Sequence, residues 1–232
     1  LEFIDGPVGF SNMDKAGLLI EGYEELNTMI TWYHYPYQKE HLKKLGFTKL
    51  AEWVEYKIKI FSADEAPEKV KKFSKIIQQR YELKVLNFKS RKEIIPYVDK
   101  MFELLNVTYS NLQTYVTIKQ YQIDFYKEKF IKYIHPDFIK CCLDKDGNLI
   151  AFLITMPSFS RALKKINGKM GLMGYYHLFK AQYFNDRVSL YLIGVDPKYQ
   201  SKGVTAVIFN ELQNTFNNCL LYTSPSPRDL ST

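Results

Sequence analysis

The chain has 232 residues, of which 46% are hydrophobic and 25% are charged, the composition of an ordinary globular protein with apolar material for one or two cores. No apolar run reaches the ~20 residues that a membrane-spanning helix requires, so we expect no membrane partner. The formal net charge is +7. Because the lysines are spread along predicted helices together with glutamates, this charge favours a solvated surface over a nucleic-acid interface.

The first 62 residues are predicted to contain one short helix and one short strand. Residues 37–45 have the pattern of an amphipathic helix, and Gly46 is placed to end it. Residues 53–60 are then predicted to form a strand. Four residues at or just before the start of this helix either line a ligand pocket between two parts of the chain or fill it with packed side chains: Tyr33, Tyr35, Pro36 and Tyr37.

Residues 64–80 are predicted to form a connecting helix, because Pro67 suits a first turn and apolar residues recur at helical spacing. A strand is expected at 81–88. Ser90 and Glu93 then have the spacing of a capping box, which predicts the start of a helix that extends to Leu105. A second helix is expected from about residue 118 to residue 134.

A β-hairpin is the clearest local prediction, because strands at 138–143 and 149–156 flank the turn dipeptide Asp146-Gly147. Cys141 and Cys142 are neighbours in the first strand, so they point to opposite faces and are not expected to pair. Buried free thiols are typical of a reducing compartment, and we therefore expect a cytoplasmic protein. The turn lacks the spacing of a calcium loop and the histidines show no ligand spacing, so we predict no metal site.

The most informative segment begins with an apolar run of strand length, Leu190 to Val195, which Asp196-Pro197 ends. Apolar residues at helical spacing from Val204 to Phe216 predict a helix, so residues 200–205 form the turn into it. The first amides of a helix have no internal acceptors, and with the helix dipole they suit a phosphate or diphosphate. Gly203 removes a side chain where such a ligand would approach the backbone. Similar segments occur in α/β proteins that bind nothing there, so the residues alone leave both interpretations open.

Val195 to Gly203, VDPKYQSKG, resembles the acetyl-CoA loop of the GNAT acyltransferases, in which Gln or Arg is followed by two residues, Gly, one residue, and then Gly or Ala. Gln200 and Gly203 match this pattern, whereas Thr205 stands where the family prefers Gly or Ala. The predicted order of elements from residue 82 onward is also that of the GNAT core. The resemblance implies an α/β (α+β) fold with a mixed central sheet flanked by helices. Within the family, the chain looks closest to bacterial two-lobed proteins of uncertain substrate.

The resemblance also implies a domain organisation. Residues 1–62 would be the C-terminal part of a first GNAT-like lobe, residues 63–81 a connecting helix, and residues 82–218 a second, CoA-binding lobe that is incomplete at its C-terminal end. Residues 219–232 are interpreted as a non-native tail, because CLLYTSPSPRD is the translation of a transposon adapter used in preparing sequencing libraries. A natural tail rich in Ser and Pro is the alternative.

Site residues follow from the resemblance as well. In the family, the strand before the loop lends backbone groups to the pantetheine arm and the acyl carbonyl, which assigns this role to Ile193, Gly194 and Val195. Gly194 suits a bulge or a close ligand approach. The residues assigned to the diphosphate loop are Gln200, Ser201, Lys202, Gly203, Val204 and Thr205. The family's tyrosine acid belongs to a later helix. The remaining candidates for acid or base form a polar and aromatic cluster that equally suits a packed surface helix: Tyr175, Tyr176 and His177.

The resemblance implies an acyl-CoA-dependent N-acyltransferase that transfers an acetyl or other acyl group to the amine of a small molecule or peptide. Two other functions stay open. One is a CoA-binding or regulatory module that has lost catalysis, because a fold does not determine a function. The other is a tandem-GNAT aminoacyl transferase that uses charged tRNA, which the positive charge permits.

Overall fold

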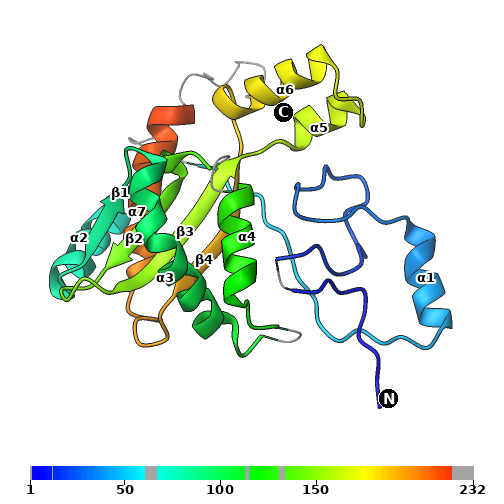
Figure 1. The fold of residues 1–232 in the computed structure, drawn as a ribbon, viewed down its shortest axis with the longest axis horizontal. Helices are drawn as coiled ribbons and strands as arrows, with labels where there is room; N and C mark the ends of the chain where they lie inside the picture. Colours follow the sequence, from blue (N-terminus) through cyan, green and yellow to red (C-terminus); the bar gives the residue numbers. More distant parts are fainter. Residues whose placement is uncertain (1, 12, 61–66, 113–114, 131–133, 221–232) are drawn as a thin grey trace.

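The structure is a computed structural model that describes residues 2–11, 13–60, 67–112, 115–130 and 134–220 (Figure 1). The predicted non-native tail therefore lies outside the described residues from position 221 onward. In the described part, residues 67–220 form a layered α/β body, and residues 2–60 form a mostly irregular segment beside it.

The centre of the body is a four-stranded sheet with the strand order β1-β2-β3-β4. The strands are β1 (Lys84–Asn87), β2 (Ile139–Leu143), β3 (Leu149–Pro157) and β4 (Val188–Val195). All pairings among the described strands are antiparallel. The predicted α/β fold class is confirmed, while the parallel pairing of a mixed sheet is absent from the part of the sheet that the structure describes.

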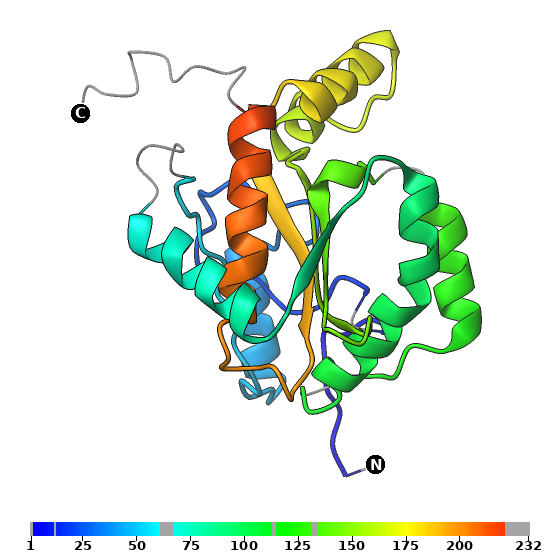
Figure 2. The same ribbon diagram turned by 90° about the vertical axis from the view of Figure 1, so that its left-hand side faces the viewer.

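Helices cover both faces of the sheet (Figure 2). On one face lie α2 (Glu68–Arg80) and α7 (Val204–Leu220), whose buried side chains include Ile77, Ile208 and Leu212. On the other face lie α3 (Arg91–Tyr109) and α4 (Gln120–Phe130), with buried side chains that include Leu105 and Ile123. The two-sided cover explains why β2 and β3 are apolar along nearly their whole length rather than alternating.

The β2–β3 hairpin confirms the local prediction. Asp144 fixes the turn, because its carboxylate accepts hydrogen bonds from the Asp146 amide at 3.0 Å and the Asn148 amide at 2.9 Å. The two neighbouring cysteines belong to opposite cores, Cys141 to the α3 side and Cys142 to the α2 side. Both are free and buried, as the alternation of a strand requires.

Between β3 and β4 the chain forms two further helices, α5 (Ser160–Ile166) and α6 (Leu172–Tyr183). They pack on each other and project beyond one end of the sheet, where Figures 1 and 2 show them in yellow. Since β3 and β4 are directly paired neighbours, this pair of helices replaces what would otherwise be a short hairpin turn.

Helix boundaries agree with the sequence pattern to within a few residues, apart from ends that lie outside the described residues, at 64–66 and 131–133. The start of α3 differs in detail from a capping box. Ser90 donates its hydroxyl to the Glu93 carboxylate at 3.2 Å instead of accepting a backbone amide. Glu93 accepts the Lys89 amide at 2.9 Å, one residue earlier than a capping box requires.

In residues 2–60 the helix prediction is confirmed and the strand prediction is wrong. Helix α1 (Pro36–Lys44) ends with Gly46 at φ +89, and the Phe47 amide bonds back to the Leu42 carbonyl at 3.1 Å. Residues 53–60 form no strand; Trp53, Val54, Tyr56 and Ile58 are exposed, and only Ile60 packs partly buried against the core. An alternating pattern makes a segment ready to pair, but a strand forms only when another segment supplies the hydrogen bonds, and none of the described segments does so here.

Candidate functional site

The outer edge of β4 is the starting point of the site. The Asp196 amide donates to the Ile150 carbonyl at 2.8 Å, and Gly194 pairs with Phe152 in the β3–β4 register. Successive residues of an antiparallel strand direct their N–H and C=O groups to opposite sides, so the backbone groups of Ile193 and Val195 point away from β3. These two residues therefore present their polar backbone groups along an edge that no described strand covers.

Side chains of α3 and the loop occupy the carbonyl groups of this edge. The Tyr109 hydroxyl donates to the Ile193 carbonyl at 3.0 Å. The Val195 carbonyl accepts the Gln200 side-chain amide at 3.1 Å. The Thr108 hydroxyl, which donates to the Leu104 carbonyl at 2.6 Å, lies 3.5 Å from the same Val195 carbonyl. The edge thus keeps its acceptors engaged by the protein, while the N–H groups of the same two residues remain directed outward.

The loop after β4 folds through local hydrogen bonds. The Asp196 carboxylate accepts the Lys198 amide at 2.8 Å, and the Asp196 carbonyl accepts the Tyr199 and Gln200 amides at 2.8 and 3.1 Å. This Asx-type turn reverses the chain immediately after the strand. Ser201 then adopts φ +61 and Gly203 φ +81, which aims the chain into α7.

Four amides around the start of α7 have no protein acceptor among the described residues, those of Ser201, Gly203, Val204 and Thr205. They belong to the turn before the helix and to its first residues, where intrahelical acceptors do not exist. The helix dipole adds partial positive charge at the same end. The local geometry is therefore suited to an anion.

A hollow of about 280 Å³ lies where the β4 edge meets these amides. Its lining comes from the end of α3, the outer edge of β4 and the loop: Thr108, Tyr109, Ile193, Val195, Gln200, Ser201 and Thr205. Five of these were assigned to the site from sequence, so the fold brings together the strand part and the loop part of the predicted site.

Thr108 and Tyr109 are the lining residues that sequence reasoning missed. Burial raises the pKa of Tyr109, so its hydroxyl stays protonated at neutral pH. A signal was available, because Tyr109 follows Leu105 by four residues and so continues the apolar face of the same helix.

Close side-chain packing accounts for both glycines that were assigned to the site, Gly194 and Gly203. A Cβ on Gly203 would lie 2.9 Å from the Phe73 ring and 3.1 Å from Ile77, both on α2. A Cβ on Gly194 would lie 2.5 Å from the Phe152 ring. The β4 bulge falls instead at Tyr191, where the register shifts between the pairs of Ile154 and Thr155. The glycines therefore allow close packing of α2 on α7 and of one strand on the next.

Lys202 and Val204 also lie apart from the lining. The Lys202 ammonium lies 5.1 Å from the Tyr199 ring centroid and 5.6 Å from that of Tyr81, a cation–π arrangement. The Val204 side chain is buried in the core under α7. Toward the hollow, these two residues can therefore contribute their backbone groups but not their side chains.

Tyr175, Tyr176 and His177 lie on α6, at the end of β4 opposite to the loop (Figures 1 and 2). Both tyrosines are exposed. The structure does not bring these three residues to the hollow. Tyr33, Tyr35 and Tyr37 are likewise exposed, and their neighbouring ring centroids lie 5.6 and 5.9 Å apart.

The described residues offer neither a metal-binding cluster nor a membrane-spanning helix. No group of three or more His, Cys, Asp and Glu side chains there could hold a metal ion. Among the same residues, no helix combines the length and the apolar character needed to cross a membrane.

Comparison with known proteins gives remote similarities. Models of known protein families give no match. Protein YghO of Escherichia coli is 22% identical over 211 residues, which make up 88% of this chain and 52% of that protein. The chain thus spans about half the length of this relative.

Two solved structures are similar over part of the chain. One is described as histone acetyltransferase HPA2 and related acetyltransferase from Corynebacterium glutamicum, with 15% identity and a TM-score of 0.33, covering 55% of this chain and 68% of that one. The other is L-PGS from Bacillus licheniformis, with 12% identity and a TM-score of 0.35, covering 67% of this chain and 38% of that one. The order of strands and helices in residues 82–220 agrees with the predicted order, with α5 and α6 inserted between β3 and β4, so the body of the chain has an α/β fold.

Proposed function

We propose that the chain is an acyl-CoA-dependent N-acyltransferase that moves an acetyl or other acyl group to the amine of a small molecule or peptide. The observation that carries the proposal is the hollow in which the outer edge of β4 meets four amides without protein acceptors at the start of α7. In this proposal residues 82–218 hold the acyl-CoA, and residues 1–62 belong to a neighbouring lobe.

The hollow suits the two chemical parts of such a substrate. A diphosphate needs N–H donors and positive potential, which the amides of Ser201, Gly203, Val204 and Thr205 provide. A pantetheine arm carries amide groups, which suit the outward N–H groups of Ile193 and Val195. The volume of about 280 Å³ lies just below the range for ligand pockets, so only part of the substrate would be enclosed.

Acyl transfer to an amine creates negative charge on the carbonyl oxygen and then on the departing sulfur. The outward N–H groups of β4 are suited to the first charge. Tyr109 is suited to the second, because burial keeps its hydroxyl protonated and it reaches the same edge. To donate there, the Tyr109 hydroxyl must first leave the Ile193 carbonyl.

One observation favours a second function, a CoA-binding module without transfer. The carbonyl groups of Ile193 and Val195 already accept hydrogen bonds from Tyr109 and Gln200. While the Tyr109 hydroxyl donates to the Ile193 carbonyl it cannot protonate a departing sulfur, whereas the amides at the start of α7 still suit the diphosphate of CoA.

The test is calorimetric titration of the chain with CoA, together with the variants Thr205→Glu and Thr205→Gln. Thr205 is exposed in the first turn of α7, so both replacements fit sterically. A carboxylate there stabilises the helix by about 0.3–1 kcal/mol. Beside a diphosphate, the same carboxylate costs on the order of 1–4 kcal/mol at ~4 Å.

We therefore expect Thr205→Glu to melt at the same or a higher temperature and to bind CoA about tenfold more weakly or worse, while Thr205→Gln binds as the parent chain does. Equal CoA binding by the two variants, or no heat from the parent chain, overturns the proposed site. Release of free thiol from acetyl-CoA in the presence of an amine panel then separates the transferase from the binding module.

A further inference from the structure

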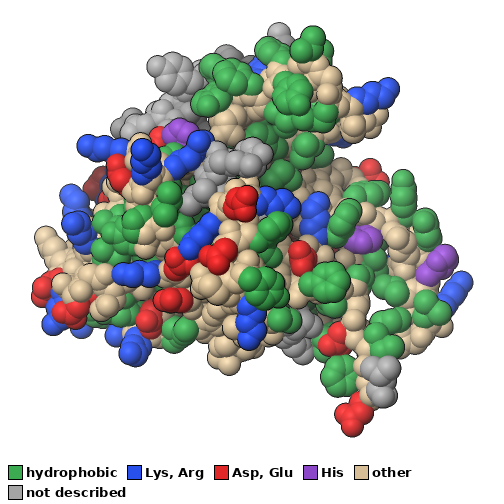
Figure 3. All heavy atoms as spheres, viewed as in Figure 1, with side chains coloured by type: hydrophobic (Ala, Val, Ile, Leu, Met, Phe, Trp, Pro, Cys, Tyr) green, Lys and Arg blue, Asp and Glu red, His purple; other side chains and the backbone are tan. Residues whose placement is uncertain are grey.

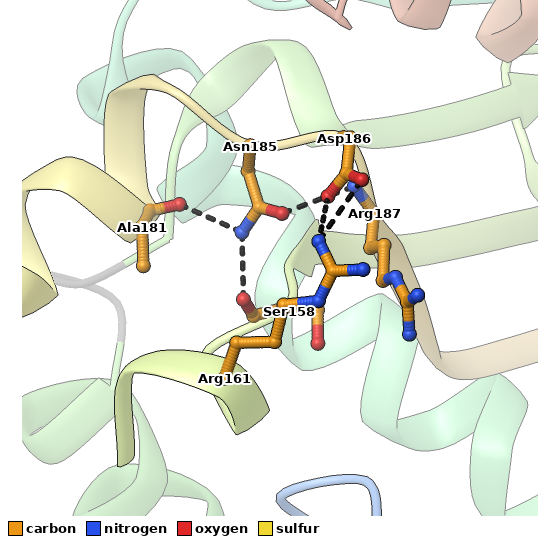
Figure 4. Close-up of polar contacts among 6 residues, drawn as sticks. All are labelled: Ser158, Arg161, Ala181, Asn185, Asp186 and Arg187. Atoms are coloured by element: carbon orange, nitrogen blue, oxygen red, sulfur yellow. Dashed lines mark hydrogen bonds and ion pairs between the residues drawn. The ribbon is translucent and has the colours of Figure 1, made fainter. Parts of the chain in front are cut away.

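The helical hairpin, α5 and α6 with their connection (residues 160–183), is fixed to the body by a polar clamp at its base (Figure 4). The Asn185 side-chain amide donates to the Ser158 carbonyl at 2.6 Å and the Ala181 carbonyl at 2.9 Å, and its oxygen accepts the Arg187 amide at 3.0 Å. Arg161 of α5 pairs with Asp186 at 3.0 Å. Side-chain contacts therefore fix the base of the hairpin to the end of the sheet.

Helix α6 turns its apolar stripe outward. Its buried positions are small, Gly174 and Ala181, and a Cβ on Gly174 would lie 3.7 Å from Ile166 of α5. Four large residues at helical spacing form the exposed stripe, Leu172, Tyr176, Phe179 and Tyr183, with exposed fractions of 91%, 55%, 59% and 56%. A surface helix normally buries such a stripe, and contiguous exposed apolar patches mark interaction sites.

Charge on the hairpin has one sign. Residues 162–185 contain four lysines and no aspartate or glutamate, although the whole chain has 25 acidic residues in 232. The lysines are Lys164, Lys165, Lys169 and Lys180. None of them forms an ion pair with a described residue. Figure 3 shows hydrophobic side chains gathered over this projecting part of the molecule, with basic side chains beside them.

We propose that the helical hairpin docks on the surface of an anionic lipid bilayer. The stripe of Leu172, Tyr176, Phe179 and Tyr183 would lie at the boundary between headgroups and acyl chains, and the four lysines would contact anionic headgroups. At 12 residues, α6 is far too short to cross a bilayer, so it lies on the membrane. Surface binding of this kind needs no spanning segment, so it revises the expectation of no membrane partner.

Two other occupants fit less well. A second copy of the chain, packed stripe to stripe, would bring the four lysines of each copy close together, which like-charge repulsion opposes. A nucleic acid would satisfy the lysines, but it offers no apolar partner for Leu172 or the neighbouring exposed Met173.

The test is flotation of the whole chain with vesicles of phosphatidylcholine alone and of phosphatidylcholine mixed with phosphatidylglycerol. We expect binding only to the mixed vesicles, and less binding as salt is raised. Two hairpin variants, Leu172→Gln with Phe179→Gln, and Lys164→Gln with Lys165→Gln and Lys169→Gln, should both bind more weakly. The lysine variant should lose about fivefold per lysine.

The control variants remove the same kinds of side chain, apolar or basic, from helices outside the hairpin. Tyr121→Gln with Ile95→Gln removes exposed apolar side chains from α4 and α3, and Lys69→Gln with Lys72→Gln and Lys75→Gln removes the same charge from α2. Both should float as the parent chain does. Tyr176→Trp adds a fluorophore on the stripe, which brominated acyl chains should quench beyond the level seen with Trp32 and Trp53 alone.

Three outcomes overturn the proposal. The first is equal flotation of hairpin and control variants. The second is no flotation, together with a concentration-dependent dimer that the Leu172→Gln, Phe179→Gln variant abolishes. The third is no flotation, together with salt-sensitive RNA binding or capture by a protein partner that the hairpin variants lose.

Discussion

Replacing Gly203 by alanine tests whether the missing side chain serves the packing of α2 on α7. Two costs add. Gly203 has φ +81, where a Cβ costs about 1–2 kcal/mol. The new Cβ would also lie 2.9 Å from the Phe73 ring and 3.1 Å from Ile77, and such overpacking costs about 1–3 kcal/mol. Gly203→Ala should therefore lower the free energy of unfolding by about 2–5 kcal/mol.

Gly147 provides the matched control, since it has φ +80 in the β2–β3 turn and no atom lies within 4 Å of its added Cβ. Gly147→Ala should cost only the backbone component, about 1–2 kcal/mol. Urea unfolding of both variants isolates the packing component by difference. In a Phe73→Ala background most of that difference should vanish, because the closest contact is gone. Equal costs for the two glycine variants would refute the packing argument.

Three further predictions concern the site edge, the buried thiols and the hairpin clamp. Tyr109→Phe should lower the free energy of unfolding by about 1 kcal/mol, because the Ile193 carbonyl loses its protein donor. The same carbonyl then becomes available to CoA, so the affinity for CoA should rise. Weaker CoA binding in calorimetry would contradict this. Burial, then the Asp144 charge, raises the pKa of Cys142 from 9.0 to about 12, so the folded state favours the protonated thiol. This thiol therefore contributes fully to the free energy of unfolding below pH 9, and the contribution is lost as pH rises toward 12, at up to about 1.4 kcal/mol per pH unit. When unfolding is measured across this range, the free energy of unfolding of Cys142→Ala should fall less steeply with pH than that of the parent chain. Asn185→Ala, which removes three hydrogen bonds, should lower the free energy of unfolding by about 1–3 kcal/mol. Asp186→Asn breaks a half-exposed ion pair and should lower it by less than ~1 kcal/mol. The reverse order in urea unfolding would show that the ion pair holds the hairpin.

Local rules account for the parts of the fold that the sequence predicts well. The β2–β3 hairpin was predictable because Asp146-Gly147 determines the turn and both strands are apolar runs. The failure at residues 53–60 has the opposite origin. Their apolar and polar residues satisfy a strand pattern, but pairing depends on a partner segment that the pattern itself cannot reveal.

In the candidate site, too, local features were predictable from the sequence and long-range contacts were not. The loop after β4 was predictable, since a strand end, an Asp-Pro pair and a helical repeat lie close together in sequence. Tyr109 was missed because its contact with Ile193 spans 84 positions. Gly203 was recognised as necessary, but its neighbour is Phe73 on α2, and the sequence cannot show which group fills the space beside a glycine.

The junction of the helical hairpin with the sheet has a consequence for how the protein can be re-engineered. Pro157 pairs with Val188, and the Ser158 amide donates to the Arg187 carbonyl at 2.9 Å, so the two ends of the insertion stand side by side. Residues 159–186 can therefore be excised and bridged by a tight turn without moving a strand. The hairpin can thus be removed as a unit, and grafting it onto another antiparallel strand pair would transfer its exposed apolar and basic side chains without the rest of the chain.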